Sequence, residues 1–143
     1  MALVNLLLVD DEVPFVATMT KRLTKRDLKV TSAYSGDEAL NKLQEEPALE
    51  VVILDVKMPG MDGIETLKMI KQQAPLVEVI MLTGHATVES AIDGMKLGAF
   101  DYLMKPCDLD HLLTKVNEAA RKKRQHEEKI VAARIREITA RHA

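Results

Sequence analysis

The stretch VVILD, residues 51–55, decides the fold, because it describes a buried strand that runs directly into a carboxylate. Four consecutive apolar residues, two of them valine, are typical of a strand that is covered on both faces. The next segment, Val56–Gly63, is rich in turn residues, and a helical pattern resumes at Ile64. In open parallel α/β sheets, binding sites lie at the carboxyl ends of the strands. The sequence therefore predicts that Asp55 lies at such a site.

The pattern of an apolar run followed by a helical segment occurs five times along the chain. The helical spacing is clearest at Val88, Ala91, Ile92 and Met95, and Ser35–Glu38 has the spacing of a capping box. The predicted strands cover residues 3–9, 28–33, 51–54, 77–82 and 100–104. This strict alternation predicts an α/β fold, with a five-stranded parallel sheet and helices on both of its faces.

Composition favours one globular domain with an appendage. The 143 residues are 47% hydrophobic and 29% charged, which argues against disorder. The single cysteine, Cys107, excludes an internal disulfide framework and fits a reducing compartment. The chain has no signal-peptide pattern and no apolar run of membrane-spanning length, so we expect a cytoplasmic protein without a membrane partner.

Polar residues at four predicted strand ends would converge on one edge of the sheet. Asp10 and Asp11 follow the first strand, Asp55 the third, Thr83 the fourth and Lys105 the fifth. Crowded carboxylates repel one another unless a cation lies among them, and hard oxygen ligands favour Mg²⁺. Mg²⁺ opposite a lysine suits phosphoryl oxygens, and a central carboxylate can itself become phosphorylated. Asp55 is the candidate nucleophile, with Asp10 and Asp11 as metal ligands.

These strand-end motifs resemble the signature of the receiver domains of bacterial two-component response regulators. The motifs are Asp10-Asp11, Asp55 with the following Met58–Gly63, Thr83-Gly84 and Lys105-Pro106. The resemblance covers about residues 3–120. The segments 84–91 and 98–102 are most similar to receivers of enhancer-binding transcription activators.

The resemblance implies a flavodoxin-like strand order, 2-1-3-4-5, and a set of roles around the phosphorylation site. Asp55 would take a phosphoryl group from a phosphohistidine of a sensor histidine kinase. Mg²⁺ would be bound by Asp11, Asp55 and the backbone carbonyl of Lys57, while Asp10 would help through a water molecule. Thr83 and Lys105 would contact the phosphoryl group.

The resemblance also implies a switch. Thr83 would move toward the phosphoryl group and the ring of Tyr102 would turn inward behind it, so that the Val88–Met104 face presents a changed surface. The Lys105–Pro106 peptide would be cis, which proline makes affordable.

Lys57 and His85 each lie two residues after a site residue, and in this family such positions resemble tuners of aspartyl-phosphate lifetime. The alternative is that both are simply solvated loop residues.

The segment 121–143 is basic, with eight Lys/Arg against three Asp/Glu, whereas residues 1–120 are acidic. Without Gly or Pro to interrupt it, a last helix capped by Asp108 would continue through this extension. Local spacing predicts the ion pairs Glu118–Lys122 and Glu137–Arg141. Exposed apolar residues near the end favour a dimerising linker over a frayed linker to an output domain: Ile130, Val131, Ile135 and Ile138. The chain has no nucleic-acid recognition motif, so we expect no direct nucleic-acid binding.

The interpretation is a phosphorylation-controlled switch that does not act on an external substrate, serving as the regulatory part of a transcription activator. One alternative is a free-standing receiver that acts by protein contact. A metal-dependent phosphatase with Asp55 as nucleophile is less favoured, because position 57 is lysine where a second acid is wanted. A flavodoxin-like cofactor binder is disfavoured because acidic strand ends repel phosphate.

Overall fold

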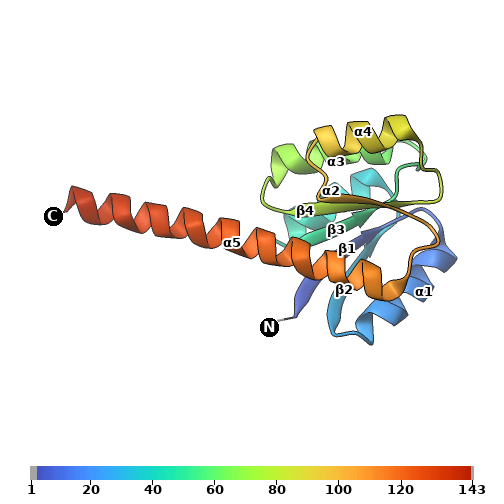
Figure 1. The fold of residues 1–143 in the computed structure, drawn as a ribbon, viewed down its shortest axis with the longest axis horizontal. Helices are drawn as coiled ribbons and strands as arrows, with labels where there is room; N and C mark the ends of the chain where they lie inside the picture. The colour runs from blue at the N-terminus through green and yellow to red at the C-terminus, as the bar shows by residue number, and fades with distance from the viewer. Residues whose placement is uncertain (1–2, 143) are drawn as a thin grey trace.

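The computed structural model describes residues 3–142, and its core is one parallel sheet (Figure 1). The strands are β1 (Val4–Val9), β2 (Leu28–Ala33), β3 (Val51–Leu54), β4 (Glu78–Thr83) and β5 (Asp101–Met104). Their order is β2-β1-β3-β4-β5, and every neighbouring pair is parallel. The predicted fold class and strand order are confirmed. No strand begins or ends more than one residue from its predicted position.

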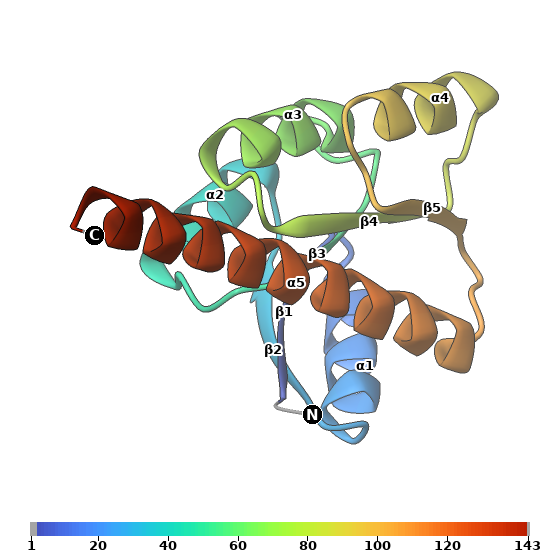
Figure 2. The same cartoon turned by 60° about the vertical axis from the view of Figure 1, so that its left-hand side comes forward.

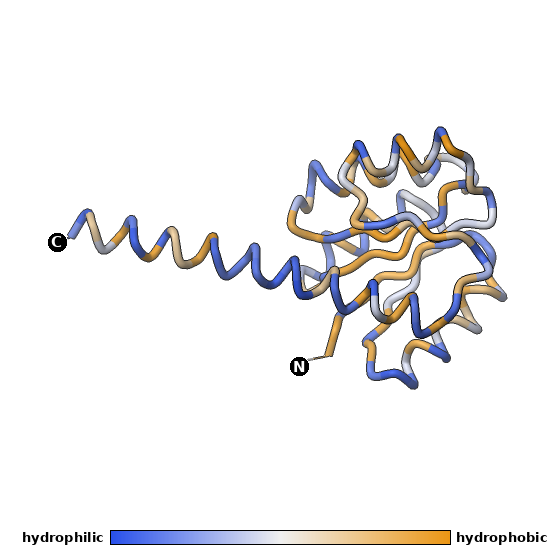
Figure 3. Tube along the Cα trace, in the orientation of Figure 1, coloured by the Kyte–Doolittle hydropathy of each residue, from blue (hydrophilic) through white to orange (hydrophobic). Residues whose placement is uncertain are grey.

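Helices cover both faces of the sheet, as the two views in Figures 1 and 2 show. They are α1 (Val13–Thr24), α2 (Gly36–Glu45), α3 (Gly63–Gln73), α4 (Val88–Lys96) and α5 (Leu109–Arg141). Alternation along β1 divides the core: Leu6 and Leu8 pack with residues of α1 and α5, whereas Leu7 and Val9 pack with residues of α2 and α3. The central strands are the most apolar part of the trace in Figure 3, as burial on both faces requires.

Polar caps set the starts of several helices. The Ser35 hydroxyl accepts from the backbone N–H of Glu38 at 3.1 Å. The Glu38 carboxylate accepts from the N–H of Tyr34, where the predicted capping box would have used that of Ser35. Asp108 caps α5 by accepting from the N–H of His111 at 3.2 Å, as predicted.

Helix α5 is a single helix of 33 residues that continues well beyond the sheet (Figure 1). The predicted pair Glu137–Arg141 forms, at 3.0 Å. The predicted pair Glu118–Lys122 is wrong, because Lys122 lies 3.4 Å from the buried carboxylate of Glu78 and Glu118 turns instead to Lys115, at 3.7 Å. Among residues 3–142, none of the helices is both long and apolar enough to cross a bilayer.

Candidate functional site

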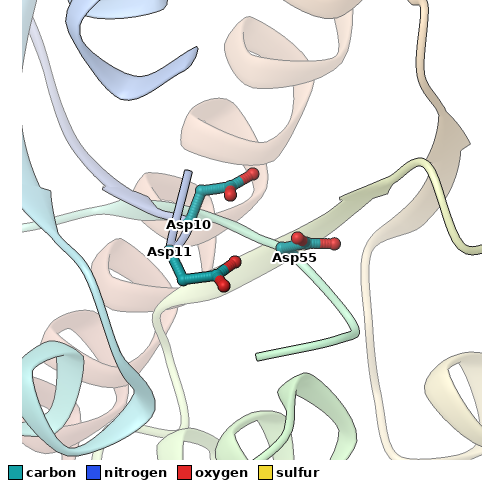
Figure 4. A group of neighbouring side chains, drawn as sticks. All are labelled: Asp10, Asp11 and Asp55. Atoms are coloured by element: carbon teal, nitrogen blue, oxygen red, sulfur yellow. The ribbon is translucent and has the colours of Figure 1, made fainter. Parts of the chain in front are cut away.

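Three carboxylates gather at the carboxyl edge of the sheet. One oxygen from each of Asp10, Asp11 and Asp55 lies within 4.8 Å of the others, and Figure 4 shows the side chains pointing to the same side. Asp10 and Asp55 are 2% and 1% exposed, whereas Asp11 is partly exposed to solvent. Strands β1 and β3 are neighbours in register, which brings their carboxyl ends together. We call these three residues the acidic cluster.

Lys105 lies directly beside the acidic cluster. Its Nζ donates to Asp10 Oδ2 at 2.6 Å, lies 3.6 Å from Glu12 Oε1 and sits 3.9 Å above the ring centre of Phe15. Burial alone would lower the pKa of Lys105, but the bond to Asp10 and the charges of Asp10, Asp55 and Glu12 raise it overall. Lys105 is therefore a fixed cation at neutral pH. The peptide bond between Lys105 and Pro106 is cis.

The carboxylate of Asp55 is held in an unfavourable environment for a negative charge. Burial is the largest cause that raises its pKa, and the neighbouring charge of Asp10 raises it further. Hydrogen bonds from the Thr83 hydroxyl and from the backbone N–H of Val56, at 2.8 Å for the latter, together with the charge of Lys105, only partly offset this. The net pKa is raised, so a cation bound nearby would relieve a real electrostatic cost.

The loop after Asp55 folds back tightly against the end of β3. The N–H of Gly63 donates to the carbonyl of Val56 at 2.7 Å, and a Cβ at position 63 would lie 2.0 Å from the carbonyl oxygen of Asp55. No side chain fits there, which explains why glycine follows Asp62, the residue that caps α3. This turn fixes the backbone on which Asp55 is presented.

Thr83 and Tyr102 occupy different surroundings. Thr83 is fully buried at the end of β4, beside Asp55, and its hydroxyl accepts from the N–H of His85 at 3.0 Å. Tyr102 is half-buried on β5, and its hydroxyl lies 2.6 Å from Ser90 Oγ on α4. In the state described, the tyrosine therefore ties α4 to β5.

Lys57 and His85 line one depression of about 430 Å³ next to the acidic cluster. Its lining residues are Asp11, Glu12, Lys57, Met58, Pro59 and His85. The two residues of the lifetime hypothesis thus lie where a small molecule could approach Asp11.

Sequence reasoning missed three contributors to this site: Glu12, Phe15 and Ser90. Glu12 directly follows Asp10 and Asp11 in one acidic run, and this run is a sequence signal that places Glu12 near the same strand end. Ser90 lies three residues after Thr87 and completes a capping box with it. This spacing is visible in the sequence and indicates where α4 begins. Nothing in the local sequence pairs Phe15 with Lys105, because 90 positions separate them.

The acidic cluster suits a hard divalent cation. Its donors are carboxylate oxygens without histidine or cysteine, which fits Mg²⁺ better than a transition metal. Because Lys105 engages Asp10, the carboxylates of Asp11 and Asp55 are those best placed to bind such an ion directly.

Residues 6–117 match the response regulator receiver domain. The chain belongs to this family. Receiver domains are phosphoryl-acceptor signalling domains, and those of response regulators are phosphorylated by sensor histidine kinases.

Similar curated proteins include transcription regulators. The chain is 38% identical over 112 residues to the DNA-binding transcriptional regulator NtrC of Klebsiella pneumoniae, covering 78% of the chain and 24% of NtrC. It is 38% identical over 116 residues to the transcriptional regulatory protein ZraR of Salmonella typhimurium, covering 81% of the chain and 26% of ZraR. The chain thus spans about a quarter of the length of these relatives. The predicted resemblance to receivers of transcription activators is confirmed, and the phosphatase alternative finds no support.

Solved structures agree with the fold. A receiver domain protein of Clostridium thermocellum has a TM-score of 0.82 and 36% identity, covering 86% of this chain and 98% of that one. NtrX of Brucella abortus has a TM-score of 0.81 and 29% identity, covering 91% of this chain and 29% of that one.

Proposed function

We propose that this receiver accepts a phosphoryl group on Asp55 from a sensor histidine kinase and relays the event by a change of surface. The observation that carries the proposal is the acidic cluster with Lys105 beside it. A buried carboxylate lies at the centre, two further carboxylates lie within 4.8 Å, and a fixed cation bonds to one of them. This arrangement suits the handling of phosphoryl oxygens better than any structural purpose, since on its own it is electrostatically costly.

The transfer needs the ionised carboxylate of Asp55. One of its oxygens attacks the phosphorus of a phosphohistidine, and an oxygen–phosphorus bond forms as the nitrogen–phosphorus bond breaks. The histidine nitrogen leaves with the bonding electron pair. Lys105 and the hydroxyl of Thr83 would then contact the phosphoryl oxygens, which carry the developing charge.

The cofactor we propose is Mg²⁺. Asp11, Asp55 and the backbone carbonyl of Lys57 would hold it, and Asp10 would help through a water molecule. When bound, the ion neutralises charge on the phosphoryl oxygens.

The switch follows from two contacts that would change. The Thr83 hydroxyl, now bonded to the N–H of His85, would turn to the phosphoryl group. Tyr102 would give up Ser90 Oγ and turn inward, which releases the tie between α4 and β5. The Val88–Met104 face, on which Val88, Ile92, Met95 and Met104 are exposed, would then bind a partner differently.

Lys57 and His85 would tune how long the phosphate persists, because both line the depression beside Asp11, where they would border a water molecule that attacks the phosphoryl group. Replacing them together, Lys57→Asn with His85→Ala, should change the rate at which phosphate is lost by several-fold. An unchanged half-life would remove this hypothesis.

The output is proposed from the relatives. NtrC and ZraR are transcriptional regulators about three times as long as this chain, which supports a regulatory role within a transcription activator. We propose a homodimer formed through the α5 extension, where Ile130, Val131, Ile135 and Ile138 are each about half exposed, or through the Val88–Met104 face. A free-standing receiver acting by protein contact is the second candidate.

The test is the intact mass of the protein after incubation with acetyl phosphate and Mg²⁺. Wild-type protein should gain one stable phosphoryl group, and chelating the metal should prevent the gain. Asp55→Asn should gain none, whereas Asp37→Asn, which neutralises an exposed aspartate on α2, should behave as wild type. Phosphorylation of Asp55→Asn would overturn the assignment, and continuous turnover of excess donor would favour the phosphatase.

A further inference from the structure

The opposite edge of the sheet buries two carboxylates of its own. Glu50, immediately before β3, is 6% exposed, and Glu78, the first residue of β4, is 3% exposed. The two are adjacent, since the N–H of Glu78 donates to the carbonyl of Glu50 at 3.1 Å. These strands carry Asp55 and Thr83 at their other ends. Strand β3 is therefore flanked by a buried carboxylate at each end, whereas β4 begins with the buried carboxylate of Glu78 and ends with the hydroxyl of Thr83.

Helix α5 supplies a close partner for Glu50. Arg124 Nε donates to Glu50 Oε2 at 2.5 Å and Nη2 donates to Oε1 at 2.9 Å, so the guanidinium and the carboxylate are joined at two points. Arg124 Nη2 also donates to the carbonyl of Leu3 at 3.3 Å, and Glu50 Oε1 accepts from the N–H of Asn5 at 3.1 Å. One arginine thus joins α5 to the beginnings of two strands.

Glu78 is joined to α5 by charge. Lys122 Nζ lies 3.4 Å from its Oε2, and Lys71 Nζ of α3 lies 3.5 Å from its Oε1. Within residues 3–142, Glu78 Oε2 is a buried side-chain oxygen without a hydrogen-bond partner, so the two lysines are what compensate its charge. A carboxylate buried in this way is costly when its cations leave, which ties Lys122 to this place.

These contacts lie where apolar packing of α5 ends. The buried residues of α5 are Leu112, Leu113, Val116, Ala119 and Ala120. From residue 121 to 142 no side chain of α5 is buried, and Figure 1 shows this part of the helix running out from the domain. The first turn beyond the core is therefore held to the domain by Lys122 and Arg124.

We propose that Glu50, Glu78, Lys122 and Arg124 form a charged latch that holds the α5 extension in one direction relative to the sheet. The latch acts at the amino ends of the two strands whose carboxyl ends carry the phosphorylation site. The extension and that site thereby belong to one rigid body, and a partner or segment bound to the extension would be held at a set position. The proposal does not depend on phosphorylation of Asp55.

The experiment uses double electron–electron resonance to measure the distance between two spin labels, one on each side of the latch. Spin labels are placed on Lys68→Cys of α3 and Arg136→Cys of the extension, both exposed, after Cys107→Ser removes the single native cysteine. Labelled protein is diluted with unlabelled protein so that only distances within one chain are detected. The variants are Arg124→Gln, Glu50→Gln and the control Arg121→Gln, which removes an exposed arginine from the same helix.

The latch predicts a narrow distance distribution in the unmodified background and in Arg121→Gln. Arg124→Gln and Glu50→Gln should broaden the distribution about twofold and raise amide hydrogen exchange across residues 121–130 by about tenfold. Circular dichroism checks that each variant is folded. If Glu50→Gln does not fold, the comparison of Arg124→Gln with Arg121→Gln is sufficient, because position 124 is partly exposed. A distribution as narrow in Arg124→Gln as in Arg121→Gln would overturn the proposal.

Discussion

The two edges of the sheet bury the same kind of residue with opposite consequences. At the carboxyl edge, Asp10, Asp11 and Asp55 are gathered around one lysine, Lys105. Three negative charges therefore face one positive charge. The excess makes the edge a place for a metal ion and a phosphoryl group, because a bound cation relieves the repulsion.

At the amino edge, the buried carboxylates are balanced by cations. Arg124 bonds to Glu50, and Lys122 and Lys71 lie beside Glu78. Burial raises the pKa of Glu50, but the bonds from Arg124 and Asn5 and the charges around them lower it overall. The pKa of Asp55 is shifted the other way. Charge balance therefore separates a structural carboxylate from a chemical one more clearly than burial does.

The largest expected effect is on the balanced edge. Glu50→Gln should lower the free energy of unfolding by about 2 kcal/mol, because it leaves the Arg124 guanidinium without its charged partner. Urea denaturation measures the change. Glu45→Gln, which neutralises an exposed glutamate on α2, is the matched control and should change it by less than about 0.5 kcal/mol. If Glu50→Gln and Glu45→Gln changed the free energy of unfolding equally, the ion pair of Glu50 with Arg124 would contribute no more than an exposed ion pair.

The second effect is on the unbalanced edge. Mg²⁺ at ten times its dissociation constant should stabilise the protein by about 1.4 kcal/mol, since it binds the folded acidic cluster and not the unfolded chain. Asp11→Asn should abolish most of this gain, whereas Glu50→Gln should retain it. Urea denaturation with and without MgCl₂ measures both. If Asp11→Asn responds to Mg²⁺ as wild type does, the ion does not bind at this cluster.

The sequence was most informative at the carboxyl edge. A strand buried on both faces requires a run such as Val51–Leu54, and parallel pairing brings the residues after such runs together. Asp10, Asp55 and Lys105 could therefore be assigned to one place although they are far apart along the chain. The sheet topology alone predicts that these residues lie together, and no side-chain conformation has to be known.

The amino edge could not be predicted in the same way. Glu50 precedes a strand and has no local sign of burial, and its partner Arg124 lies 74 positions later on a helix whose phase is set by packing. Local spacing paired Glu118 with Lys122, but the buried charge of Glu78 is the stronger attraction for that lysine. Ion pairs over long sequence separations depend on such competition, which no local pattern describes.

The smallest effect contrasts the pH dependence of the two edges in metal-free buffer. The folded state raises the pKa of Asp55, so its ionisation costs stability as pH rises through that raised value. Asp55→Asn removes the cost and should be about 1 kcal/mol more stable than wild type at neutral pH, with the gain vanishing in acid.

The pKa of Glu50 is lowered, so its stabilising contribution is present above the unfolded pKa and is lost as pH falls through the folded one. The deficit of Glu50→Gln should likewise vanish in acid, with the opposite sign at neutral pH. Urea denaturation of both variants and wild type from pH 7 downward measures the two differences, and differences of the same sign would end the distinction between the edges.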